Sequence, residues 1–131
     1  MALLPGTFNL EKNENFVEYL TGIGLPEDKA KQFNLVVSPL VVKVDGQKIT
    51  LCRQVQGDTE FTLGQEFEEK MPTGHVLKSI GTLNNNVLTI KSTTPDGKSG
   101  EKIYEFTAGG LVVTLKAETT PVVAKRTYKR A

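Results

Sequence analysis

Turn signals recur at intervals of about 8–12 residues from Ser38 to the end of this chain, and no other feature limits its fold as strongly. The segments between the turns are short and alternate apolar with polar side chains, as half-buried strands do. Together with Thr7 to Leu10 they make about ten strands, which predicts an all-β antiparallel up-and-down barrel or sandwich. Closing such a sheet into a barrel removes its edges and can enclose one small ligand. The turn signals are Asp45-Gly46, Gly57-Asp58, Pro72 to Gly74, Asn84 to Asn86, Pro95 to Gly97 and Gly109-Gly110.

A helical hairpin interrupts this pattern between the first strand and the second. Asn13 and Asn15 offer capping oxygens to a first helix, and Pro26 begins a second helix that runs to about Leu35. Two short helices joined within a few residues, at about 15–35, can lie across one open end of the barrel. The chain is therefore expected to form one lidded domain over residues 1–131. The apolar residues at helical spacing in the first helix are Phe16, Val17, Tyr19, Leu20 and Ile23.

The last strand, Val122 to Arg130, carries an arginine and a tyrosine on the face opposite its lysines. Side chains alternate along a strand, and Lys125 and Lys129 belong in water. Arg126 and Tyr128 therefore face the barrel interior, where a buried guanidinium requires a partner. A ligand carboxylate fits, held by charge-assisted hydrogen bonds from the arginine and a further one from the phenol. The alternative is a basic surface strand that carries a tyrosine.

Alternation also predicts which other side chains line an internal cavity. Phenylalanines taken singly are more often plain core, and only the whole set indicates a ligand. Three further polar candidates are Arg53, Tyr104 and Glu69. Arg53 is inward in one register and outward in the register shifted by one residue, and on the inward face Glu69 is its nearest partner. The apolar positions are Leu51, Val55, Phe61, Leu63, Phe106, Val113 and Leu115 on the strands, and Phe16, Leu20 and Phe33 on the helices.

The charge balance argues against a nucleic-acid partner. Sixteen Lys and Arg against fifteen Asp and Glu leave a net charge of +1, so no bulk field attracts nucleic acid or an anionic membrane. A small nucleic-acid-binding β-barrel is nevertheless the rival from another class, because Tyr128 lies among Lys125, Lys129 and Arg130, and such proteins interleave aromatic and basic residues. The near-neutral charge and the strand number fit that class poorly.

We expect neither catalysis nor a metal or cofactor. The single histidine, His75, lies in a glycine-flanked turn, and the single cysteine, Cys52, lies on the face opposite Leu51. These residues cannot supply a nucleophile, a base and an orienting group, and no metal-ligand cluster is apparent. One cysteine excludes an internal disulfide. No secretion signal and no apolar run of about 18 residues is seen, which predicts a cytoplasmic monomer.

Short motifs also occur in an order and spacing that characterise one family. They are Gly6-Thr7-Phe8-Asn9-Leu10, Asn15-Phe16, Tyr19-Leu20, Val44-Asp45-Gly46, Ile49-Thr50-Leu51, Leu63-Gly64-Gln65-Glu66-Phe67, Asp96-Gly97-Lys98 and Arg126-Thr127-Tyr128. With these motifs the chain resembles, over essentially its whole length, the intracellular lipid-binding proteins, which include fatty-acid-binding and cellular retinoid-binding proteins. The resemblance implies a flattened barrel of two near-orthogonal sheets with a helix-turn-helix lid, which holds one long-chain fatty acid or a related ligand without catalysis.

The same resemblance implies roles for individual residues. Arg126 and Tyr128 match the family's carboxylate-binding pair on the last strand. Tyr104 occupies the position at which many members have a second arginine, so a retinoid or another hydrophobic molecule is an alternative ligand. A secreted lipocalin-like carrier is a further alternative on fold, against which the missing signal and the single cysteine speak.

The resemblance also implies a portal through which ligand enters. The portal would lie between the second helix, the Gly57-Asp58 turn and the Gly74-His75 turn. Lys31 on that helix, with Lys29, would contact anionic membranes transiently during ligand transfer. The alternative is a solvated helix face, since surface lysines need no special explanation.

Overall fold

The computed structural model describes residues 5–35, 39–53, 58–70, 76–95 and 97–131, and these residues form ten strands and two helices. Both helices, α1 (Phe16–Gly22) and α2 (Glu27–Leu35), lie between the first strand and the second. The predicted all-β fold with a helical hairpin is confirmed. The strands are β1 (Gly6–Glu14), β2 (Leu40–Asp45), β3 (Lys48–Arg53), β4 (Thr59–Thr62), β5 (Glu66–Lys70), β6 (Val76–Asn84), β7 (Val87–Thr93), β8 (Ser99–Phe106), β9 (Gly110–Ala117) and β10 (Thr120–Arg130).

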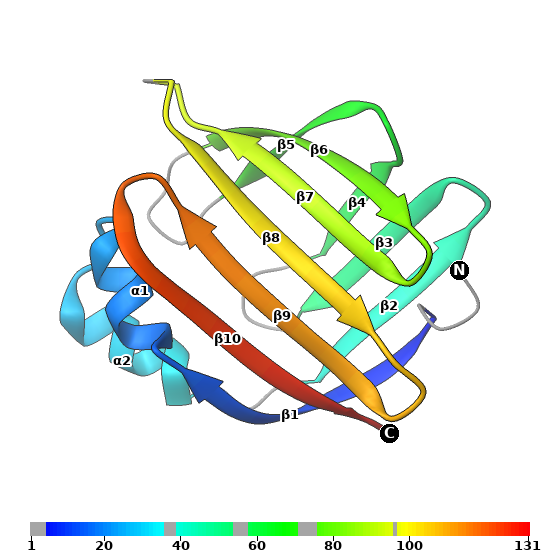
Figure 1. Ribbon diagram of the computed structural model, residues 1–131, viewed down its shortest axis with the longest axis horizontal. Helices are drawn as coiled ribbons and strands as arrows, with labels where there is room; N and C mark the ends of the chain where they lie inside the picture. Colours follow the sequence, from blue (N-terminus) through cyan, green and yellow to red (C-terminus); the bar gives the residue numbers. More distant parts are fainter. Residues whose placement is uncertain (1–4, 36–38, 54–57, 71–75, 96) are drawn as a thin grey trace.

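The strands form one antiparallel sheet in the order β4-β3-β2-β1-β10-β9-β8-β7-β6-β5. Strand β1 pairs with β2 on one side and with β10 on the other. The first and last strands of the chain are therefore neighbours in the sheet. In Figure 1, β7 to β10 form a front layer and β2 to β4 cross behind it. This is the up-and-down meander that the turn spacing predicts.

The barrel is nearly closed, with a seam between β4 and β5. These two strands are the ends of the sheet order in the described chain, so the expectation that closure removes every edge is wrong here. Side chains cover the seam: the rings of Phe61 on β4 and Phe67 on β5 stack at 4.6 Å. A Cβ on Gly81 of β6 would lie 2.5 Å from the Phe61 ring, and this glycine therefore makes room for the stack. Aromatic packing replaces the missing ladder of hydrogen bonds.

The helices cover one end of the barrel, where α1 packs on β10 and α2 packs on α1 (Figure 1). Helix α2 begins one residue later than predicted, at Glu27. Pro26 precedes the helix, and its carbonyl oxygen accepts a hydrogen bond from the Ala30 N–H at 2.9 Å. The predicted side-chain caps of α1 are wrong. Asn15 is its N-cap residue in a left-handed conformation, φ 57°, without a side-chain cap, and its amide donates to the Val123 carbonyl at 3.4 Å.

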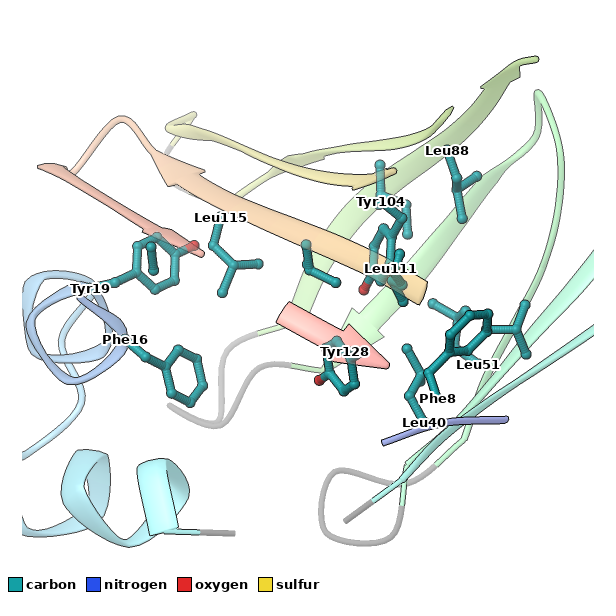
Figure 2. Close-up of a cluster of buried hydrophobic side chains, with 14 of the residues drawn as sticks. Phe8, Phe16, Tyr19, Leu40, Leu51, Leu88, Tyr104, Leu111, Leu115 and Tyr128 are labelled. Carbon is teal, nitrogen blue, oxygen red and sulfur yellow. The ribbon is translucent and has the colours of Figure 1, made fainter. Parts of the chain in front are cut away.

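The core follows the alternation of the strands. Along β6 and β7 buried and exposed side chains alternate regularly, and the buried set faces the barrel interior (Figure 2). The largest of the fully buried side chains are Phe8, Ile49, Leu51, Leu88, Ile90, Leu111, Val42 and Ser79. Their burial on several strands around the barrel accounts for a single continuous core.

Strand β1 departs from the regular alternation at Glu11. Its pairing with β10 shifts between Leu10 and Lys12, so one residue of β1 has no partner opposite it. Before this bulge the even-numbered residues of β1 lie opposite even-numbered residues of β10, as Leu10 does opposite Tyr128. After it Asn13 lies opposite Arg126. A bulge therefore moves an asparagine, at an odd position, to the face on which the arginine lies.

Candidate functional site

Arg126 projects from β10 toward the lid and is half-buried. Its Nε donates a hydrogen bond to Asn13 Oδ1 at 2.9 Å, and its guanidinium carbon lies 4.3 Å from the centre of the Phe16 ring. Phe16 is the first residue of α1, so the lid rests on the guanidinium through an aromatic ring. Such a cation–π contact lets an arginine lie beside apolar groups without a carboxylate partner.

The charge of Arg126 is not neutralised by the described part of the chain. Its hydrogen-bond acceptor, Asn13, is an uncharged amide, and among the described residues no carboxylate forms an ion pair with it. A guanidinium carries five N–H donors in a fixed fork, of which Nε uses one here. An arginine held in this way can bind an anion through its remaining donors.

Tyr128 lies two residues along β10 and its side chain is buried. Its ring lies 5.7 Å from the Arg126 guanidinium carbon, and Ala124 on the same face is also buried. The two side chains predicted to bind a carboxylate therefore share a face of β10. Figure 2 shows Tyr128 within the cluster of buried side chains, with Tyr104 drawn above it beside Leu111.

Most of the predicted apolar positions are buried. Leu63 is half-buried against the core. The side chain of Phe33 and all of Val55 lie outside the described residues. The other seven, which are Phe16, Leu20, Leu51, Phe61, Phe106, Val113 and Leu115, are all in the core. Burial alone is compatible with plain core and with a ligand wall, and the assignment to a ligand wall stays a prediction.

The three further polar candidates have different outcomes. Tyr104 is buried on β8, with its ring 6.5 Å from that of Phe106. Glu69 is buried on β5, and it pairs with Lys102, whose Nζ lies 2.6 Å from Glu69 Oε2. The side chain of Arg53, which we expected as the partner of Glu69, lies outside the described residues.

Sequence reasoning missed the polar cluster around Glu69. Ser79 Oγ donates to Glu69 Oε1 at 3.3 Å, Ser92 Oγ does so at 3.5 Å, and the two hydroxyls are 2.7 Å apart. Lys102 lies two residues before Tyr104 on β8, so the alternation that turned Tyr104 inward was the signal that could have placed Lys102 on the same face. We define the Glu69 cluster as Glu69, Ser79, Ser92 and Lys102.

Tyr19 on α1 lies near this cluster. Burial raises the pKa of the Tyr19 hydroxyl to about 12, with smaller contributions from the negative charge of Glu69 and from Tyr104. The phenol therefore keeps its proton at neutral pH and acts there as a neutral hydrogen-bonding group. Figure 2 shows Tyr19 and Phe16 projecting from the same helix toward the strands.

A cavity of about 390 Å³ lies between α1 and the ends of β7, β8 and β9. Tyr19, Ile23, Leu77, Ser92 and Lys102 line it, and exposed residues of the β7–β8 turn lie at its rim. Its size is within the range of roughly 300–1,000 Å³ typical of small-molecule sites. None of the predicted wall positions lines this cavity.

The predicted portal is described only in part. Gly57, Gly74 and His75 lie outside the described residues, and Asp58 is exposed at the start of the segment that leads into β4. Lys31 is exposed and forms an ion pair with Glu27 one turn earlier on α2, at 3.2 Å. This pairing is typical of a solvated helix face.

Among the described residues, no group of three His, Cys, Asp or Glu side chains is placed to hold a metal ion. Neither described helix combines the length and the apolar character needed to cross a membrane.

The chain is similar to known fatty-acid-binding proteins over nearly its full length. No protein-family model matches it. Fatty acid-binding protein 12 of Homo sapiens is 30% identical over 130 residues, which cover 97% of this chain and 91% of that protein. A fatty-acid-binding protein structure from the brain of Drosophila melanogaster is 31% identical, with a TM-score of 0.86 over 97% of this chain and 98% of that one. The structure of the REP1-NXSQ fatty acid transporter is 27% identical, with a TM-score of 0.89 over 100% and 98% of the two chains.

Proposed function

Because this chain belongs to the fatty-acid-binding proteins of the intracellular lipid-binding family, we propose that it is a non-catalytic carrier of one long-chain fatty acid. The ligand carboxylate binds Arg126 and Tyr128 on β10, and the alkyl chain lies among the apolar side chains of the barrel. The protein acts as a cytoplasmic monomer that solubilises and transports its ligand.

The observation that carries this proposal is the environment of Arg126. The guanidinium faces inward beside Phe16 and Tyr128, and its hydrogen-bond acceptor Asn13 is neutral. A half-buried arginine whose acceptor is neutral gains more from an incoming anion than an arginine that already forms an ion pair with a carboxylate. A fatty acid supplies both the anion and the apolar chain that this interior accommodates.

The energetics suit a reversible carrier. Burial of about fourteen methylene groups at about 0.8 kcal/mol each contributes about 11 kcal/mol. Association and ordering of the ligand cost several kcal/mol, so dissociation constants from nanomolar to micromolar are expected. The contacts at Arg126 then supply orientation and selectivity for an acid more than total affinity.

The test compares a fatty acid with the alcohol of the same chain length. The purified protein is delipidated, and binding of both ligands is measured by calorimetry for the native chain and for Arg126→Gln. We expect the acid to lose about tenfold to a hundredfold in affinity, the value of charge-assisted hydrogen bonds, while the alcohol changes little. Lys129→Gln, which removes an exposed charge from the same strand, is the control.

Equal losses for acid and alcohol would contradict the role of Arg126. Mass spectrometry of the molecule released on delipidation distinguishes a fatty acid from a retinoid, which Tyr104 in place of a second arginine keeps as the second candidate. Salt-dependent binding of single-stranded nucleic acid without uptake of fatty acid would overturn the carrier altogether.

A further inference from the structure

The cavity under α1 contains a polar site that the carboxylate assignment does not use. Lys102 and Ser92 line it together with Tyr19. Glu69 lies behind them, 3% exposed, and accepts hydrogen bonds from Lys102 Nζ at 2.6 Å and from Ser92 Oγ at 3.5 Å. The lining therefore includes the ammonium-bearing Lys102, the hydroxyl-bearing Ser92 and the phenol-bearing Tyr19, together with apolar residues such as Ile23 and Leu77 and, toward the β7–β8 turn, further polar residues that include Lys98 and Glu101.

In the described part of the chain this site contains charges of both signs, whereas Arg126 has a neutral hydrogen-bond acceptor. The ammonium of Lys102 and the carboxylate of Glu69 form a close ion pair with little exposure, 15% and 2% of their side chains. A second carboxylate placed against Lys102 would lie within a few ångströms of Glu69 and be repelled by it. A neutral hydroxyl is not repelled: it accepts a hydrogen bond from Lys102 Nζ and donates one to Ser92 Oγ.

The strand register gives the separation of the two sites. Across β8, β9 and β10, Tyr104 lies opposite Val113 and Val113 opposite Arg126. Lys102 lies two residues from Tyr104 on β8 and is therefore two strands and two residues from Arg126. The strand spacing and rise place their Cα atoms about 12 Å apart. A long-chain ligand with its carboxylate at Arg126 can therefore reach Lys102 with an atom near the middle of its chain.

Helix α1 connects the two sites along one face. Phe16, at the start of the helix, covers the Arg126 guanidinium at 4.3 Å, and Tyr19, one turn later, lines the cavity that contains Lys102. Residues three apart lie on the same side of a helix. Helix α1 therefore carries one residue at each site, Phe16 at Arg126 and Tyr19 beside Lys102.

We propose that this barrel binds long-chain fatty acids that carry a hydroxyl near the middle of the chain, with the carboxylate at Arg126 and the hydroxyl at Lys102 and Ser92. This inference rests on the proposed function, because it takes the position of the carboxylate from it. It adds a ligand class, the mid-chain hydroxylated acids, that an apolar cavity would disfavour, since a buried hydroxyl without partners loses its hydrogen bonds to water.

The experiment measures four dissociation constants by calorimetry on delipidated protein. The ligands are stearic acid, a stearic acid hydroxylated near mid-chain, a stearic acid hydroxylated next to the carboxylate, and a dicarboxylic acid of the same length. The test variant is the double substitution Lys102→Met with Glu69→Leu, which removes both charges together and leaves neither one buried alone. Lys91→Met, on the exposed face of β7, is the control, and thermal unfolding checks that each variant is folded.

We expect the native chain to bind the mid-chain hydroxy acid at least as tightly as stearic acid, and the dicarboxylic acid more weakly than either. In the double variant the mid-chain hydroxy acid should lose about tenfold in affinity, the value of two hydrogen bonds, while stearic acid changes less than threefold. The acid hydroxylated next to the carboxylate should follow stearic acid, and Lys91→Met should change none of the four.

Three outcomes overturn the inference while the carrier function stands. They are equal losses for stearic acid and the mid-chain hydroxy acid, no loss for either, and a preference of the native chain for the dicarboxylic acid. If the native chain binds none of the four acids, the proposed function fails and the inference fails with it.

Discussion

Asn13 Oδ1 lies 2.9 Å from Arg126 Nε, and this hydrogen bond joins the first strand to the last at the point where the lid begins. The bulge at Glu11 is responsible, because without it Asn13 would face away from β10's inward side chains. The contact orients the guanidinium without neutralising it. We infer that the asparagine is a positioning residue for the carboxylate site.

The first prediction replaces this neutral partner by a charged one. Asn13→Asp places a carboxylate beside the guanidinium, which then has an internal ion-pair partner. Fatty acid should bind about tenfold more weakly, because the ligand carboxylate is repelled by Asp and competes with it for the same donors. The alcohol of the same length should bind as before. Competition with a fluorescent fatty acid measures both.

Asn15→Asp is the matched control for that substitution. It adds the same charge two residues later, at an exposed position whose side chain bonds to the Val123 carbonyl and not to Arg126. Solvent screens the added charge there, so the affinity for acid should change less than threefold. A similar loss in both variants would mean that the net charge of the lid matters and the contact with Arg126 does not.

The second prediction concerns stability at high pH. The pKa of Tyr19 is raised from 10.0 to about 12 in the folded protein, first by burial and then by Glu69 and Tyr104. The folded state thus holds this proton more tightly than the unfolded chain does. The resulting stability is complete below about pH 10 and is lost as the pH rises toward about 12, a change of about 2–3 kcal/mol.

Denaturant unfolding of the native chain and of Tyr19→Phe at a series of pH values measures this change. The two proteins differ only at residue 19, so the difference between the two stability curves isolates Tyr19. The native chain should lose about 2–3 kcal/mol more than Tyr19→Phe between about pH 10 and pH 12. Parallel curves would show that the phenol is solvated in the folded state.

The third prediction concerns the ion pair between Lys102 and Glu69. Lys102→Met removes the partner at 2.6 Å from a carboxylate that is almost fully buried, and we expect a loss of about 3–5 kcal/mol in the free energy of unfolding. The double substitution with Glu69→Leu should recover most of it, since Ser79 and Ser92 still bond to each other at 2.7 Å. Thermal and urea unfolding measure both.

The surface pair Lys48–Glu60 is the control for this comparison. Its N–O distance is 3.1 Å, and both side chains are about half exposed, 51% and 54%. Lys48→Met should therefore cost less than about 1 kcal/mol. A loss as large as that of Lys102→Met would mean that burial does not decide the strength of these pairs.

The architecture could be predicted from the sequence because its signals are local. Asp45-Gly46 and Asn84 to Asn86 mark turns by their own backbone preferences, and the alternation around Leu51 or Tyr104 needs no knowledge of the partner strand. The same alternation predicted the inward face of Arg126 and Tyr128. Such signals act within a few residues, so a reading of the chain in order recovers them.

The partners of the polar groups could not be predicted in this way. Glu69 pairs with Lys102, 33 residues away, and Arg126 with Asn13, 113 residues away. Both contacts depend on which strands lie opposite each other and on a single bulge in β1, which a pattern of apolar residues does not encode. The sequence by itself determined a lidded barrel with an inward arginine. Only the tertiary structure decided the partners of the two cations: in the described chain Arg126 bonds to a neutral asparagine, and Lys102 pairs with a carboxylate. These partners depend on which strands lie side by side in the barrel, and a local sequence pattern does not contain that information.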